Sequence, residues 1–205
     1  MTLLTRTEQD QVAAAINAVE RETDAELVTV LARQADNYAY IPLVWAGIVA
    51  LLVPGLVNYF TEWFGVHTLL LVQWGVFLVL GALFRIPKIN TMLIPRHVRY
   101  WRASNLARRH FLEQNLHHTK DSTGVLIFVS EAERYVEILV DQGISAKVDN
   151  KVWEGIVENF TRQVRQGNTC QGFLDCIEAC GTHLKAQVPA THERNQLPNH
   201  LVVLP

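Results

Sequence analysis

The sequence predicts a small α/β/α sandwich with a mixed three- to four-stranded sheet, interrupted by a two-helix transmembrane hairpin. Two observations carry this prediction. The polar parts of the chain contain three strand-like runs with helical patterns on both sides of them, too few alternating units for a doubly wound sheet. Between these parts, residues 41–84 contain one charged side chain, whereas 19% of the whole chain is charged. We therefore expect a soluble domain in two parts, 1–36 and 96–190, around the hairpin 41–84, and a C-terminal tail, 191–205.

The first part of the soluble domain is predicted to form a helix and a strand. The segment Thr7–Asp10 fits a capping box at the start of a helix. Val12, Ile16 and Val19 then recur at the spacing of one helical face. The following run, Glu26–Ala32, is apolar and rich in β-branched residues, which is typical of a buried strand.

Two apolar runs predict the membrane hairpin. Ile41–Val57 contains 17 residues without a charge, and Val66–Phe84 contains 19. At about 1.5 Å per residue the second run spans roughly 28 Å, close to the hydrocarbon thickness of a bilayer. The alternative is a buried helical pair within a soluble protein, which would require a larger domain than this chain provides.

The distribution of basic residues predicts the orientation of this hairpin. Lys and Arg are absent between the two runs and are frequent on both flanks, above all from Arg85 to Arg109. By the positive-inside rule, both flanks lie in the cytoplasm. The three cysteines form an odd set, and no secretory signal pattern begins the sequence. These features favour a reducing compartment and agree with the predicted orientation.

The second part of the soluble domain begins with a basic amphipathic stretch, residues 96–116. It fits either a helix that contacts an anionic lipid surface or an ordinary packed helix with a solvated arginine face. Two strands, 125–129 and 136–140, are predicted next, with a tight turn between them. Two amphipathic helices follow, one capped by Asp149 or Asn150 and one over residues 171–187, and the tail is expected to be loop-like.

The search for chemistry yields one weak candidate site. Dinucleotide-binding, P-loop and nucleophile-elbow motifs are absent from the sequence. Acidic residues near strand ends, Glu22, Asp24, Glu26, Asp141 and Asp149, could bind a hard cation such as Ca²⁺ through oxygen, but Asp141 also suits a turn and Asp149 a helix cap. Cys176, Cys180 and His183 share a helix face that could hold zinc, but they are interpreted as part of a core stripe. His110, His117 and His118 could serve a metal or acid–base role, but they are interpreted as a polar helix end. The net charge of −2 gives no support for nucleic-acid binding.

The central segment GVLIFVSEAERYVEILVDQGI, residues 124–144, resembles the core signature of the TPM domain family. The segment 19–30 looks like the family's opening helix and strand, and the whole resemblance covers residues 7–36 and 100–188. The chain is most similar to a small bacterial membrane-protein branch that carries a transmembrane hairpin inside the domain. In that branch an N-x-L-P tail like Asn195–Pro198 recurs.

The resemblance implies an α/β sandwich and, for this branch, a place in the bacterial inner membrane, whereas most members of the family carry a secretory signal and lie outside the cytoplasm. The cytoplasmic location of both termini and of the soluble domain is predicted by the distribution of Lys and Arg. It implies a non-enzymatic accessory, assembly or repair role for another membrane protein or complex. A metal-dependent phosphatase is the alternative, so enzymatic activity stays open. It also places Asp141 and Asp149 in the family's Gly-rich loop region as metal ligands, with Ca²⁺ as the implied ion. The oligomeric state is left open.

Overall fold

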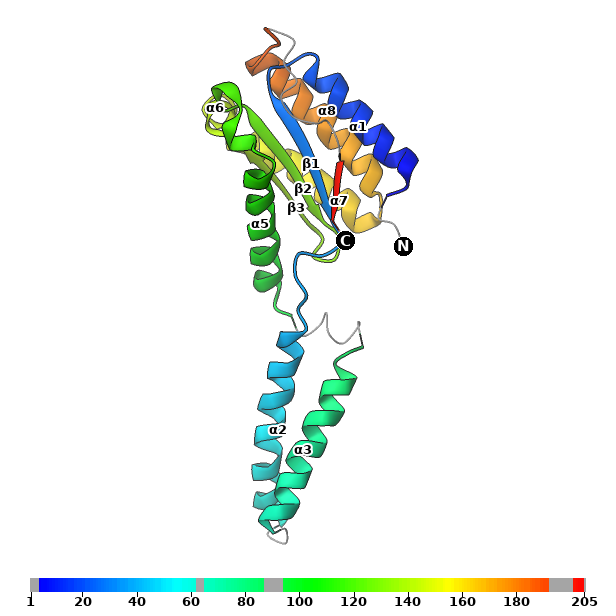
Figure 1. Ribbon diagram of the computed structural model, residues 1–205, viewed down its shortest axis with the longest axis vertical. Helices are drawn as coiled ribbons and strands as arrows, with labels where there is room; N and C mark the ends of the chain where they lie inside the picture. The colour runs from blue at the N-terminus through cyan, green and yellow to red at the C-terminus, as the bar shows by residue number, and fades with distance from the viewer. Residues whose placement is uncertain (1–3, 62–64, 87–93, 192–200, 205) are drawn as a thin grey trace. The chain divides into compact units, whose positions relative to one another are not determined.

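The computed structural model describes residues 4–61, 65–86, 94–191 and 201–204 (Figure 1). The chain divides into two compact units. The first unit comprises Met1–Ala35 and Tyr100–Pro205, and the second is Asp36–Arg99. The N-x-L-P segment 195–198 lies outside the described residues.

The first unit is built on a mixed four-stranded sheet in the order β3-β2-β1-β4. Strand β1 pairs in parallel with β2 and β4, and β2 pairs antiparallel with β3. The strands are β1 (Glu26–Ala32), β2 (Gly124–Ser130), β3 (Tyr135–Val140) and β4 (Leu201–Leu204). All seven residues of β1 and of β2 are buried, as expected for central strands covered on both faces.

Helices cover the two faces of the sheet unequally (Figure 1). The larger core includes apolar residues of α1 (Arg6–Glu20), α7 (Asn150–Gln166) and α8 (Thr169–Gln187). On the opposite face, Ala103 and Ala107 of α5 (Arg96–Glu113) pack against Val28 and Phe128. The predicted α/β/α sandwich with a mixed sheet is therefore confirmed.

Helix α1 begins earlier than the sequence pattern indicated. Thr5 is the N-cap, and it forms a capping box with Glu8 in which Thr5 N donates to Glu8 Oε2 at 2.7 Å. The prediction of a capping box at Thr7–Asp10 was wrong. The chain offered two Thr-x-x-acid patterns, and the one with the longer Glu side chain reaches back to the cap N–H.

The sequence had indicated a loop-like C-terminal tail, but part of the tail forms a strand. Residues 201–204 form β4, and Leu201 pairs with Thr29 of β1. The N–H of Arg33 donates to the carbonyl of Leu204 at 3.3 Å, which continues this pairing beyond β1. The tail thus supplies one outer strand of the sheet.

The turn between β2 and β3 holds the segment that leaves β1. Backbone N–H groups of residues 131 and 132 donate to the carbonyls of residues 32 and 33, at 3.1 Å each. The carboxylate of Glu133, which is only 3% exposed, accepts the N–H of Ala35 on both oxygens at 3.2 Å. Ser130 donates its hydroxyl to the same carboxylate. A buried carboxyl group thereby anchors the segment that leads to the second unit.

The second unit contains two apolar helices, α2 (Tyr40–Thr61) and α3 (Val66–Leu83), which pack side by side (Figure 1). Ala46 and Ala50 of α2 are buried, whereas α3 has no buried residue. Both helices are long and apolar enough to cross a membrane. Small residues on one face of α2 permit close helix packing, and the large side chains point outward.

Candidate functional site

Asp141, the first candidate metal ligand, caps a short helix. Its Oδ1 accepts the N–H of Gln142 at 2.7 Å at the start of α6 (Gln142–Ser145). Its own N–H donates to the carbonyl of Gly124 at 2.9 Å, so the end of β3 is tied to the start of β2. The second carboxylate oxygen, Oδ2, is screened from solvent and has no hydrogen-bond partner among the residues that the structure describes. Oδ1 of Asp141 therefore caps α6, whereas Oδ2 is open to a ligand.

Gly143, two residues later, is required by close packing. A Cβ at this position would lie 2.1 Å from the carbonyl oxygen of Asp121 and 2.7 Å from that of Ser122. Asp121 and Ser122 themselves have positive φ angles of 67° and 53°. The Asp141–Gly143 loop thus lies against a turn that is itself in an unusual backbone conformation.

Asp149, the second candidate ligand, is the N-cap of α7. Its Oδ1 accepts the N–H of Lys151 at 2.9 Å, and the residue is exposed. Among the described residues, no group of three or more His, Cys, Asp or Glu side chains is arranged to hold a metal ion. The capping alternative therefore accounts for one carboxylate oxygen of each aspartate, and metal binding at Asp141 and Asp149 stays a prediction.

The other polar residues at this end of the sheet have structural partners. Asp24 accepts the N–H of Thr191 at 3.1 Å and also its hydroxyl. Glu22 forms an ion pair with Lys185. These carboxylates tie the end of α8 and the residues after it to the segment between α1 and β1.

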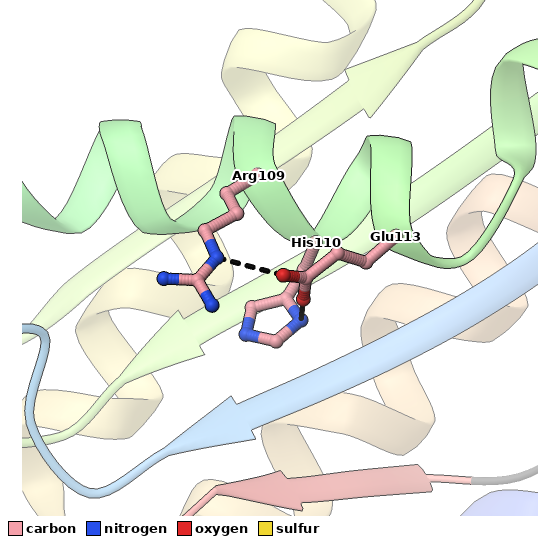
Figure 2. Close-up of polar contacts among 3 residues, drawn as sticks. All are labelled: Arg109, His110 and Glu113. Atoms are coloured by element: carbon pink, nitrogen blue, oxygen red, sulfur yellow. Dashed lines mark hydrogen bonds and ion pairs between the residues drawn. The ribbon is translucent and has the colours of Figure 1, made fainter.

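The two histidine and cysteine patterns resolve differently. Cys176 and Cys180 are buried in the larger core, which confirms the core-stripe interpretation. His110 lies in the last turn of α5 and is buried, whereas His117 and His118, just beyond that helix end, are exposed. Figure 2 shows Glu113 between two partners: Arg109 Nε donates to its Oε1 at 2.7 Å, and His110 Nδ1 lies 3.0 Å from its Oε2. Burial lowers the pKa of His110, although Glu113 opposes the shift, so the imidazole is neutral near pH 7.

Buried carboxylates lie elsewhere in the domain. Burial raises the pKa of Glu20 to about 8, against the effect of a hydrogen bond from Leu27 N, and the nearby Glu26 adds to the increase. Burial also raises the pKa of Glu137, whose Oε1 accepts the hydroxyl of Ser104 at 3.2 Å. Sequence reasoning did not single out these two residues, because glutamate is ordinarily solvated and the sequence does not show that Glu20, at the end of α1, and Glu137, within β3, are shielded from solvent.

A surface cavity of about 470 Å³ lies at the junction of α7 and α8. Arg134, Arg165, Glu8 and Glu131 line it together with Thr169, whose hydroxyl donates to Glu131 Oε1 at 3.3 Å. Two arginines and two glutamates balance the charge of this lining. The cavity therefore shows no preference for an anionic or a cationic ligand.

The fold defines a class of protein: an α/β/α sandwich whose first two parallel strands are separated in sequence by an apolar helical pair. The family model of the TPM domain matches residues 92–183, which span α5 to most of α8. The chain therefore contains a TPM domain, and the resemblance inferred from residues 124–144 is confirmed.

A comparison with solved structures supports the fold. The NMR structure of BA42 protein, from the psychrophilic bacterium Bizionia argentinensis, matches with a TM-score of 0.61 at 20% sequence identity. The match covers 98% of this chain and 94% of the BA42 chain. A search of curated proteins finds no significant match.

Proposed function

We propose that this chain is a membrane-anchored TPM-domain protein whose α2–α3 pair spans the bacterial inner membrane. The exposure of large apolar side chains on this pair supports the proposal. Leu51 is 72% exposed on α2, and Leu71 and Trp74 on α3 are 73% and 63% exposed. Exposed apolar surface on this scale is stable in lipid or against another membrane protein, and it is costly in water.

The proposed orientation places both termini and the soluble domain in the cytoplasm. Arg85 and the arginines of α5 follow the second apolar helix, whereas the segment between the helices contains no Lys or Arg. This asymmetry is the ordinary signal for cytoplasmic flanks. A reporter that is active only in the cytoplasm, fused to the C-terminus, should be active, and one that requires export should be inactive. The opposite pattern would overturn the orientation.

The function that best fits these features is a non-enzymatic accessory role in the assembly or repair of another membrane protein or complex. The single observation that supports it most is the structural role of the residues from Asp141 to Asp149, where the resemblance places the candidate metal ligands. Asp141 and Asp149 serve as helix caps, and Gly143 fills a packing position. Helix capping and close packing thus explain these residues, and no catalytic reaction is needed to explain them. The exposed apolar pair supplies a surface through which the chain can meet a membrane partner.

Affinity purification after cross-linking tests the accessory role. The tagged full chain is cross-linked in its membrane, solubilised in detergent, and its co-purifying proteins are identified and quantified by mass spectrometry. The controls are an unrelated two-span protein with the same tag, and the α2–α3 hairpin without the soluble domain. We expect a near-stoichiometric membrane protein that both controls lack. A chain that purifies only with itself would contradict the accessory role.

A metal-dependent phosphatase is the second candidate, and the unpartnered Asp141 Oδ2 favours keeping it. A carboxylate oxygen is the type of ligand that suits Ca²⁺. Calorimetric titration of the full chain with Ca²⁺, together with a phosphatase assay on a small aryl phosphate, would test it. Asp141→Asn should abolish binding and turnover if this candidate is right. Binding that is equal in the wild type and the variant would remove Asp141 from the site.

A further inference from the structure

Helix α5 concentrates the positive charge of the molecule. It contains five arginines and one glutamate, which gives a net charge of +4, while the whole chain has a net charge of −2. The rest of the chain is therefore at −6. The five arginines are Arg96, Arg99, Arg102, Arg108 and Arg109. This separation of charge makes α5 the part of the molecule best suited to an anionic surface.

The arginines at the start of α5 oppose the stability of the helix itself. The N-terminus of a helix carries a partial positive charge, which acidic residues stabilise and basic residues destabilise. Arg96 and Arg99 lie in the first turn of α5, and that turn contains no acid. Helix α1 shows the opposite arrangement, with Glu8 in its first turn. Residues that destabilise the local structure are expected at sites where they serve a function.

Arg96 and Arg99 also lack an acidic partner within the part of the chain that the structure describes. The ion pair that α5 makes with one of its own arginines uses Arg109 and Glu113, near the other end of the helix. Arg96 is exposed and Arg99 is half-buried, and Arg99 Nε has no hydrogen-bond acceptor among the described residues. Both side chains therefore reach solvent, where an external anion can contact the exposed part of each guanidinium.

Aromatic side chains accompany these arginines. Trp101 is 58% exposed, and the guanidinium of Arg102 lies 5.0 Å from the centre of its ring. Tyr100 is 37% exposed. Trp and Tyr concentrate at the headgroup level of membranes, where an amphipathic ring meets both apolar and polar surroundings. Arginine next to an exposed tryptophan is thus a combination suited to a phospholipid headgroup region.

We propose that the N-terminal half of α5, residues 96–102, binds the anionic phospholipid headgroups of the membrane that holds α2 and α3. This proposal rests on the anchoring proposed above. Helix α3 ends at Leu83 and α5 begins at Arg96, so twelve residues join them and confine the start of α5 to the neighbourhood of the bilayer. Tethering raises the local concentration of headgroups, so a few cationic contacts suffice.

The test uses the full chain reconstituted in lipid nanodiscs. The discs contain neutral phosphatidylcholine alone or mixtures with increasing fractions of anionic phosphatidylglycerol. An environment-sensitive NBD fluorophore is attached at position 97, through His97→Cys in a Cys170→Ser background, because His97 is exposed beside the two arginines. A matched protein with Lys151→Cys carries the fluorophore on the exposed start of α7 and serves as the control.

We expect a blue shift of the position-97 emission as the phosphatidylglycerol fraction rises, with no change at position 151. High salt should reverse the shift. Neutralising each arginine should weaken the apparent affinity about fivefold, so the double variant R96Q/R99Q should lose roughly 25-fold, while R96K/R99K should retain most of the response. Loss of helix would not explain this result, since removing charge from the first turn relieves the helix dipole. Far-UV circular dichroism checks that α5 persists.

Three results would overturn the proposal. The first is a position-97 emission that does not depend on phosphatidylglycerol, and the second is an equal response in R96Q/R99Q. The third is a response that occurs in native membrane vesicles but not in nanodiscs, which would assign this surface to an acidic protein partner. Co-elution of the chain with neutral nanodiscs measures hairpin insertion separately. A chain that fails to co-elute would refute the anchoring and the lipid contact together, whereas failure of the fluorophore response alone leaves the anchoring intact.

Discussion

Replacement of Glu20 by glutamine should stabilise the soluble domain at high pH and leave it nearly unchanged at low pH. Glu20 Oε1 accepts the N–H of Leu27 at 2.9 Å, while Oε2 is screened from solvent without a partner. Burial is the main cause that raises the pKa of this carboxyl from 4.5 to about 8, and the buried Glu26 is nearby. Ionised Glu20 is therefore a destabilising charge in the folded domain.

The sign of the effect follows from proton linkage. The pKa of Glu20 is higher in the folded than in the unfolded chain, so its stabilising contribution is complete below about pH 4.5 and is lost as pH rises through about 8. A pKa difference of about 3.5 corresponds to at most about 5 kcal/mol. Glu20 is only partly buried, and solvent screening reduces this to about 2–3 kcal/mol. Glutamine keeps the acceptor for Leu27 N and carries no charge.

Thermal unfolding of the full chain in neutral detergent, followed by the total tryptophan fluorescence, to which the buried Trp153 contributes, measures this difference. Near pH 9 we expect Glu20→Gln to unfold about 5–10 °C above the wild type, and near pH 5 to differ by little. The matched control is Glu154→Gln, which changes an exposed glutamate and should shift neither value. A Glu20→Gln effect of the same size at both pH values would refute the reasoning, because the difference would then not arise from ionisation.

Three further predictions concern packing and buried charge. Gly143→Ala should lower the unfolding free energy of the domain by about 2–3 kcal/mol, because its Cβ would lie 2.1 Å from a backbone carbonyl oxygen. Gly155→Ala, whose Cβ meets nothing within 4 Å, should raise it by up to about 1 kcal/mol. Urea unfolding measures both free energies, and changes of the same sign would contradict the packing argument. Glu133→Gln should cost about 1–3 kcal/mol by the same measurement because it alters a buried carboxyl group that accepts hydrogen bonds from the N–H of Ala35 and the hydroxyl of Ser130, and an unchanged midpoint would contradict its anchoring role. Ala50→Leu should lower the unfolding free energy of the α2–α3 pair by about 1–3 kcal/mol, measured by SDS unfolding followed by tryptophan fluorescence. Leu51→Ala, at a 72% exposed position, should not lower it. A larger loss for Leu51→Ala than for Ala50→Leu would contradict the helix packing.

The parts of the fold with strong periodicity were predictable from the sequence. The segment Glu26–Ala32 and the two segments after Gly124 are mainly apolar and rich in β-branched residues, and each forms a strand. The helix that begins after Asp149 and ends at Gly167 was also correctly predicted, because a cap and a glycine bound it and Gly167 has a positive φ of 84°. In each of these cases local chemistry and tertiary packing favour the same structure.

The parts that depend on distant contacts were not predictable. Residues 201–204 are too few to form a strand alone, and pairing with β1 stabilises β4. Glu133 lies in a charged turn that looks solvated in sequence, yet it is buried against Ala35, 98 residues away. Asp141 was recognised as a candidate ligand, but the sequence could not reveal that one of its oxygens caps α6 and the other has no partner.

The two roles open to Asp141 can be separated experimentally, because they use different oxygens. Capping uses Oδ1, which accepts the N–H of Gln142, and a metal would use the free Oδ2. Asparagine caps helices about as well as aspartate but is uncharged and a weaker ligand for a hard cation. Asp141→Asn should therefore preserve the unfolding midpoint of the domain, whereas Asp141→Ala should lower its stability by about 1 kcal/mol. If Asp141→Asn folds like the wild type and still co-purifies with the same membrane protein, the loop contributes to function only by supporting the fold. If it folds normally but loses that protein together with Ca²⁺ binding, the free oxygen is the functional group.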